Sequence, residues 1–228
     1  MKYYDFGCKK GSSSELCSQL GGTDGTGLDI NPVHIDDYVS LGRKAILCDI
    51  TNSGLLSGSA DFVCISHVLE HLNSRADVFR AIQEAIRISR SFVYIVGPCF
   101  EHDDFLESVG FKFNWSDWKC HPTPVRFNDV SNACVGSYGL SNVNKVSLEC
   151  LTFARIPILD TSHKCIHPLS SPKNQHNYDP AIHPPKSPVV ELKGVYKEMV
   201  AIVRIDMPSV HLSNIIQSQR LIAVEPDA

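Results

Sequence analysis

The chain has 228 residues, 43% of them hydrophobic, which is enough for one sizeable domain with its own core. Lys and Arg number 21 against 25 Asp and Glu, and this net charge of −4 argues against a nucleic-acid-binding protein, which needs a basic face. No apolar run has the length of a membrane span, and no secretory signal is recognisable at the N-terminus. The nine cysteines are odd in number and several stand in apolar runs, so we expect free thiols in a cytoplasmic protein. The composition leaves the oligomeric state open.

Short apolar runs alternate with amphipathic segments over the first half of the chain. The sequence predicts strands at residues 2–6, 25–30, 44–50, 60–66 and 91–97. It predicts one helix that begins at a capping box over 12–15 and another that begins at Asn31-Pro32. It also predicts a long helix over 74–89 and a short helix over 105–109. Strands separated by helices imply right-handed crossovers and a parallel sheet covered on both faces.

The pattern changes after residue 111. Residues 110–119 alternate like a half-exposed strand, 145–159 contain another strand, and 198–206 form a last strongly apolar strand. Residues 161–188 are rich in Pro, His, Ser and Asn and are predicted to form a long loop, and a short helix is expected around 212–221.

The residues that directly follow the predicted strands are the first candidates for a binding site, because an open parallel sheet binds ligands beyond the carboxyl ends of its strands. Gly7 and Gly11 let the backbone approach a ligand closely. Asp29, roughly 20 residues further on, can accept hydrogen bonds from ribose hydroxyls. Asp49 can accept a hydrogen bond from an adenine amino group, with Ile50 against the ring.

Four stretches resemble the successive motifs of class I S-adenosylmethionine-dependent methyltransferases, in particular the small-molecule enzymes of the type 11 group. They are "DFGCKKGSSSEL", "GLDIN", "CDIT" and "DFVCISHVLEHL". The resemblance implies an α/β fold with a doubly wound, mostly parallel, seven-stranded sheet of the Rossmann-like methyltransferase type and an irregular C-terminal extension. It implies a cofactor-binding core over 1–118, an acceptor-specificity insertion over 119–195, and a final strand with a tail over 196–228.

The resemblance also implies the cofactor, S-adenosyl-L-methionine, and the residues around it. Asp5, Gly7, Lys9 and Gly11 would surround its methionine part, Asp29 and Ile30 its ribose, Asp49 and Ile50 its adenine, and Ser66 and His67 the reactive methyl group. Lys9 stands where the family usually has a glycine, and the chain starts at the first strand without the helices that usually precede it. The expected activity is in-line methyl transfer to an unidentified small-molecule acceptor.

His67 is the candidate catalytic residue, either as a general base or as a lining group of the pocket. Glu70 and His71 are expected in the first turn of the next helix. His121 and the tryptophans Trp115 and Trp118 either face the acceptor or pack in the interior.

No metal site is expected from the sequence. His163, Cys165 and His167, followed by His176 and His183, offer ligand types for zinc, but their spacing does not match the usual zinc patterns, so solvated loop histidines are the preferred interpretation.

Two other functions compete with methyl transfer. A dinucleotide-dependent oxidoreductase would show Gly-x-Gly-x-x-Gly after the first strand, which the lysines between Gly7 and Gly11 do not match. A non-catalytic methyltransferase-like binding or scaffold domain is favoured by Lys9 and by the absence of helices before the first strand.

Overall fold

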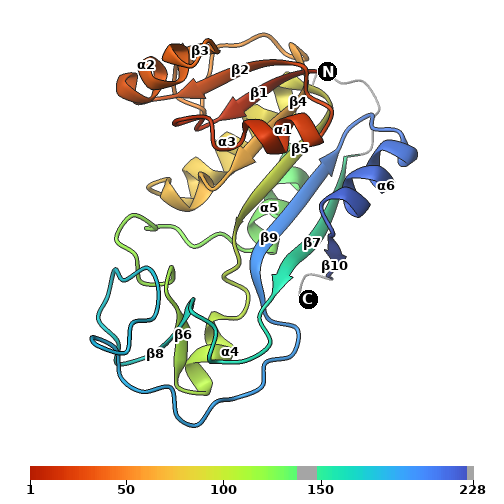
Figure 1. The fold of residues 1–228 in the computed structure, drawn as a ribbon. Helices are drawn as coiled ribbons and strands as arrows, with labels where there is room; N and C mark the ends of the chain where they lie inside the picture. The colour runs from red at the N-terminus through yellow and green to blue at the C-terminus, as the bar shows by residue number, and fades with distance from the viewer. Residues whose placement is uncertain (138–147, 225–228) are drawn as a thin grey trace.

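A computed structural model describes residues 1–137 and 148–224 and shows one large sheet with helices on both faces (Figure 1). The strands are β1 (Lys2–Phe6), β2 (Asp24–Asp29), β3 (Lys44–Leu47), β4 (Ala60–Ser66), β5 (Ser89–Pro98), β7 (Glu149–Pro157), β9 (Tyr196–Arg204) and β10 (Ile222–Ala223). Their order in the sheet is β10-β7-β9-β5-β4-β1-β2-β3. Strands β1 to β5 pair in parallel, whereas β9, β7 and β10 join by antiparallel pairing.

The doubly wound, mostly parallel α/β sheet predicted from the sequence is confirmed. The sheet has eight strands instead of seven, because the two-residue strand β10 adds to the outer edge of β7. The predicted last strand is β9, and the strand predicted within 145–159 is β7, although residues 145–147 lie outside the described residues.

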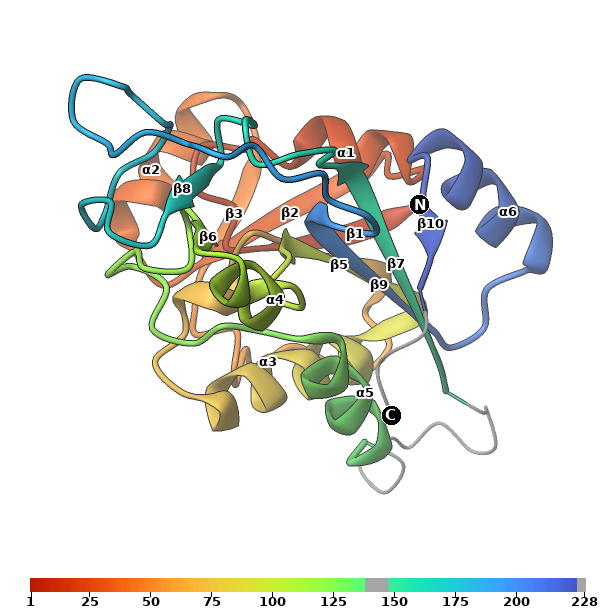
Figure 2. The ribbon, with the colours of Figure 1, turned by 90° about the horizontal axis from the view of Figure 1, so that it is seen from below.

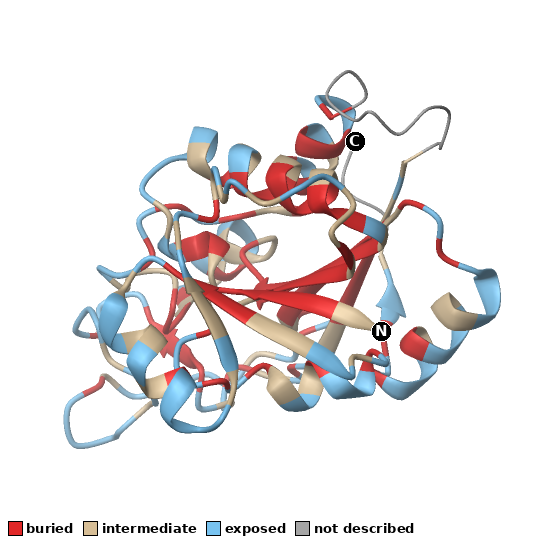
Figure 3. Cartoon of the chain, turned by 90° about the horizontal axis from the view of Figure 1, so that it is seen from above, coloured by how far each residue is buried: buried red, intermediate tan, exposed pale blue. Residues whose placement is uncertain are grey.

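Helices α1 (Ser14–Gln19) and α6 (Ser209–Ser218) cover one face of the sheet, and α3 (Arg75–Ile88) and α5 (Phe127–Val135) cover the other (Figure 2). Helix α2 (Pro32–Ser40) packs beside β2 and β3. Strand β4 shows why both faces are covered, since four successive residues, Phe62 to Ile65, are fully buried. Buried residues accordingly concentrate along the central strands (Figure 3).

The long helix α3 begins where its cap predicts. The Ser74 side chain accepts a hydrogen bond from the Asp77 amide, and Asn31 does the same for the Val33 amide at the start of α2. Helix α5 has no counterpart among the predicted elements.

A small lobe follows β5 and lies beyond the carboxyl ends of the parallel strands. It contains α4 (Asp103–Ser108) and a two-stranded antiparallel sheet of β6 (Phe111–Phe113) and β8 (Ile166–Pro168), which are adjacent in Figure 1. The lobe has its own apolar core around Phe113, Trp115 and Ile166. Two expectations were wrong here: the strand predicted over 110–119 is only three residues long, and the predicted loop 161–188 contains β8.

The segment 119–195, expected as an insertion that selects the acceptor, contributes to both parts of the molecule. It supplies α5 and β7 to the central layers as well as β8 to the small lobe. Over the described residues, no helix is long and apolar enough to cross a membrane.

Candidate functional site

Two adjoining cavities lie at the carboxyl ends of the parallel strands. The first, of about 480 Å³, is lined by Gly7, Lys9, Asp29, Ile30, His34, Asp49, Ile50, His67, Val68, His71, Leu72 and Cys120. The second, of about 630 Å³, is lined by Lys9, His67, Glu70, His71, Pro98, Trp115, Trp118, Cys120, His121, Asn174, His176, Lys197 and Glu198. We call them the strand-end cavity and the lobe cavity.

The turn after β1 forms one wall of the strand-end cavity. The amides of Gly7 and Cys8 donate to the carbonyl of Leu28, at 2.7 and 3.1 Å, which ties the turn to β2. Gly7 has φ +66°, and a Cβ there would lie 2.5 Å from the Cγ2 atom of Val68. A larger residue at this position would be strained in its backbone and would require Val68 to shift.

Lys9 has φ +47°, the left-handed conformation that glycine adopts most easily. The side chain of Lys9 is exposed at the rim of both cavities, so the lysine does not fill either of them.

Asp29, the last residue of β2, presents a buried carboxylate to the strand-end cavity. Its Oδ1 accepts from the Asn31 amide at 2.9 Å, and its Oδ2 accepts from the Lys9 amide at 3.2 Å and lies 3.1 Å from His34 Nδ1. A carboxylate has about four acceptor positions, so these contacts orient Asp29 and leave capacity for a ligand.

Asp49 follows β3 and lines the same cavity from the neighbouring strand. It is exposed, and its Oδ1 accepts from the amide and the hydroxyl of Thr51, each at 2.8 Å. The apolar side chains that line this cavity beside the two carboxylates include Ile50, which is buried, and Ile30, which is 70% exposed. The two carboxylates therefore converge on one hollow, together with the Gly7 turn.

Three predicted site residues do not line either cavity. Asp5 is fully buried beneath the turn: its Oδ2 accepts from the Ser13 hydroxyl at 2.5 Å, and burial raises its pKa to about 6. A Cβ on Gly11 would lie 1.6 Å from Nη1 of Arg43, so Gly11 makes room for that guanidinium. Ser66 ends β4 and precedes His67 in the chain.

His67 stands at the boundary of the two cavities, with φ +54° and its amide donating to the Val96 carbonyl at 2.8 Å. Its Nδ1 lies 3.6 Å from Glu70 Oε1 and its Nε2 lies 3.4 Å from Glu198 Oε1. Burial opposes the charge of the imidazole, but the two carboxylates outweigh it and raise the pKa of His67 to about 9. The imidazole is thus protonated at neutral pH.

Glu198, on β9, was missed in the sequence. Burial opposes its charge, but His67 and Arg155 outweigh that effect and lower the pKa of Glu198 to about 2. Arg155 Nε donates to its Oε2 at 2.6 Å. The sequence did contain one indication of its role: Glu198 is an acid in the strongly apolar strand 198–206, and a buried carboxylate needs a positively charged or hydrogen-bonding partner.

Aromatic side chains from the small lobe form the far wall of the lobe cavity. The indole nitrogens of Trp115 and Trp118 donate to the carbonyls of Cys99 and Gln175, at 3.3 and 3.0 Å. The His176 ring packs edge-on against Trp118, with centroids 4.7 Å apart. Trp115, Trp118 and His121 thus both pack in the lobe and line the cavity.

The loop histidines considered as metal ligands are placed elsewhere. His163 Nδ1 accepts from the Cys165 amide at 3.2 Å, and the His167 ring packs against that of His183 with centroids 4.4 Å apart. In the described ranges, a different trio, His71, Cys120 and His121, brings possible metal ligands together.

Glu70 and His71, expected in the first turn of a helix, form a separate 3-10 turn, η1 (Leu69–His71), before α3.

Comparison with known proteins agrees with this geometry. Residues 4–95 match the family model described as a methyltransferase domain. A comparison with curated proteins finds no match. Among solved structures, a SAM-dependent methyltransferase from Archaeoglobus fulgidus is 17% identical, with 89% of this chain and 85% of that chain covered and a TM-score of 0.57. The YcgJ protein of Bacillus subtilis is 11% identical, with coverages of 91% and 92% and a TM-score of 0.57.

A third similar structure is a SAM-dependent methyltransferase from Thermotoga maritima, described as a possible histamine N-methyltransferase. It is 13% identical, covers 89% of this chain and 81% of its own, and has a TM-score of 0.52. At these identities the structures establish the fold, and the family model adds the motif-bearing residues 4–95. The chain therefore has the fold of S-adenosylmethionine-dependent methyltransferases, and its residues 4–95 match the methyltransferase-domain family model.

Proposed function

We propose that the protein transfers a methyl group from S-adenosyl-L-methionine, bound in the strand-end cavity, to a small-molecule acceptor bound in the lobe cavity. The observation that carries this proposal is that the two cavities share four lining residues, Lys9, His67, His71 and Cys120. A transfer reaction needs two binding sites that meet at one point, because the reacting atoms must approach to about 3 Å.

The residues of the strand-end cavity fit the cofactor. Asp29 and Asp49 supply carboxylate oxygens for the ribose hydroxyls and the adenine amino group, and Gly7 removes the side chain that would obstruct the turn. Ile50 offers an apolar surface for the base. The cofactor brings a methyl group that is already activated on a sulfonium, so the protein mainly binds, orients and excludes water.

His67 suits a positioning function better than that of a general base. With a pKa of about 9 its imidazole already carries the proton at neutral pH, so it cannot readily accept another from the acceptor. Its contacts with Glu70 and Glu198 hold it at the point where the two cavities meet. The aromatic wall around Trp118 and the acids Glu70 and Glu198 favour an acceptor with both flat apolar and polar parts.

Isothermal titration with S-adenosylmethionine and with its demethylated product tests the cofactor assignment. We expect both to bind, and Asp29→Ala to weaken binding by about tenfold or more, because a charged hydrogen bond contributes roughly 1.5–3 kcal/mol. Asp36→Ala, an exposed acid on α2, is the matched control and should leave binding unchanged. Because Asp29 also holds the Gly7–Lys9 turn, Asp49→Ala provides a second test at an exposed position.

Mass spectrometry of the denatured protein should reveal co-purified nucleoside, and a panel of small acceptors then tests turnover. Absence of binding by both cofactor forms would overturn the proposal. Tight binding without turnover on any acceptor would instead support the non-catalytic binding domain.

A further inference from the structure

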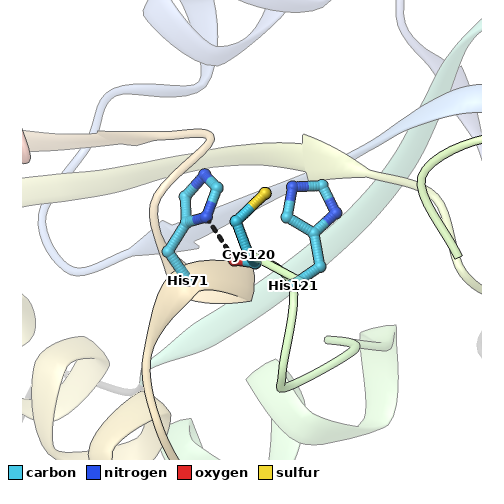
Figure 4. Close-up of side chains that lie close together, drawn as sticks. All are labelled: His71, Cys120 and His121. Atoms are coloured by element: carbon cyan, nitrogen blue, oxygen red, sulfur yellow. Dashed lines mark hydrogen bonds between the residues drawn. The ribbon is translucent and has the colours of Figure 1, made fainter. Parts of the chain in front are cut away.

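Three side chains with metal-binding groups, His71, Cys120 and His121, lie close together (Figure 4). His71 is the last residue of η1, and Cys120 and His121 lie in the loop between β6 and α5. One nitrogen of each imidazole and the Cys120 sulfur all lie within 4.8 Å of one another. The His71 and His121 rings meet edge to face, with centroids 4.8 Å apart.

Backbone contacts set the tautomer of both imidazoles. His71 Nδ1 lies 2.6 Å from the Cys120 carbonyl oxygen, and His121 Nδ1 lies 3.2 Å from the Trp115 carbonyl oxygen. A carbonyl only accepts, so each Nδ1 must donate, and each neutral ring then keeps its lone pair on Nε2. Histidines that bind metals are commonly oriented by such a hydrogen bond from the other ring nitrogen.

The trio has three protein ligands and an open side. His71 and Cys120 are exposed and line both cavities, while His121 is buried and lines the lobe cavity. Zinc with one thiolate and two imidazoles takes a fourth ligand to complete a tetrahedron. Zinc–ligand bonds of about 2.0–2.3 Å place the ligand atoms of such a site roughly 3.3–3.6 Å apart. The three ligand atoms would therefore have to approach one another by about 1 Å to bind zinc.

We propose that His71, Cys120 and His121 bind a zinc ion whose fourth position faces the junction of the two cavities. An open fourth position is typical of zinc sites that bind and activate a small ligand, whereas structural sites are closed by four protein ligands. Solvent or the acceptor would occupy that position, and zinc lowers the pKa of a bound thiol or water.

A second group in the described part of the chain, Asp5, Cys17 and Cys64, does not support the same inference. All three residues are fully buried, on β1, α1 and β4, so none of them presents a ligand atom to solvent. The Cys17 thiol and burial raise the pKa of Cys64 well above its ordinary value, so it remains a thiol, which is a poor ligand.

Metal titration of the full chain, purified without a histidine tag and treated with a chelator, tests the site. We expect one zinc per chain. Cys120→Ser and His71→Ala should each weaken zinc binding by more than about 100-fold, since loss of an outer hydrogen-bond partner alone costs 10–100-fold. Both residues are exposed, so these variants should fold, which circular dichroism checks.

The matched controls are Cys48→Ser, a half-buried cysteine outside the cluster, and His176→Ala, an exposed histidine of the lobe cavity. Both should bind zinc as the wild type does. Cobalt provides a spectroscopic readout: the thiolate-to-metal band in the near ultraviolet should be present in the wild type and absent from Cys120→Ser. Weak binding by the wild type, or equal binding by all five proteins, would overturn the proposal.

The zinc site does not depend on the proposed methyl transfer, and the two can fail separately. Asp29→Ala should lose cofactor affinity and keep its zinc affinity. If the wild-type protein binds S-adenosylmethionine but does not bind zinc, only the metal-site proposal is refuted. If it binds zinc but does not bind S-adenosylmethionine, only the methyltransferase proposal is refuted.

Discussion

His67 Nε2 lies 3.4 Å from Glu198 Oε1, although the two residues belong to distant parts of the sequence, after β4 and on β9. The contact results from the sheet order, in which β5 lies between these two strands. His67 is tied to β5 through the Val96 carbonyl, and Glu198 is opposite Pro98 on β5. The antiparallel strand β9 therefore supplies one of the two carboxylates that surround His67, and η1 supplies the other.

The His67–Glu198 pair predicts an unusual titration. Nuclear magnetic resonance of the ring proton should give a His67 pKa near 9, and Glu198→Gln should lower it by roughly one unit or more, since one of its two carboxylates is then neutral. Because the folded pKa exceeds the ordinary 6.5, the pair stabilises the fold fully below about pH 6.5, and this contribution is lost as the pH rises through 9.

Glu107→Gln, at an exposed position on α4, is the control and should leave the His67 midpoint unchanged. A wild-type midpoint near 6.5 would show that solvent cancels the influence of the two carboxylates.

The fold was largely predictable because the parallel strands are buried on both faces. Runs such as 62–65 are continuously apolar, and the helix after Ser74 has both a cap and an apolar periodicity. Helix α5 was missed because its sequence, FNDVSNACV, consists mainly of poor helix formers. Its stability comes from packing: Phe127, Val130 and Ala133 are buried in the core cluster that also contains α3.

Part of the candidate site was predictable from the sequence and part was not. The sequence indicated the residues around Asp29 and Asp49, because every parallel strand ends at the same edge of the sheet. It could not place Glu198 or Cys120 at this site, because their positions relative to His67 and His71 depend on tertiary structure. Cys120 meets His71 only because the chain returns from β6 across the mouth of the site, a path that no local pattern encodes.

Gly7→Ala should reduce both stability and cofactor affinity. A left-handed conformation costs an alanine about 1–2 kcal/mol, and its Cβ would also overlap Val68 at 2.5 Å. Gly42→Ala is the matched control, since its φ is +73° and no atom lies within 4 Å of the added Cβ. Urea unfolding should show the larger loss for Gly7→Ala, and titration should show weaker cofactor binding for that variant alone. Equal losses in the two variants would show that Val68 moves aside.

Arg155→Met tests whether the Glu198 network stabilises the fold. Arg155 is 20% exposed and donates to Glu198 and to Gln219 beyond α6, so its loss leaves a buried carboxylate with one fewer cation. Breaking a buried ion pair costs about 3–5 kcal/mol, which urea unfolding at pH 7 would detect. Lys44→Met is the control, because its pair with Asp24 is 71% and 53% exposed, so solvent screens it and its loss should leave the free energy of unfolding nearly unchanged. If both variants lose the same small amount, water already screens Glu198, and its low pKa must come from His67 alone.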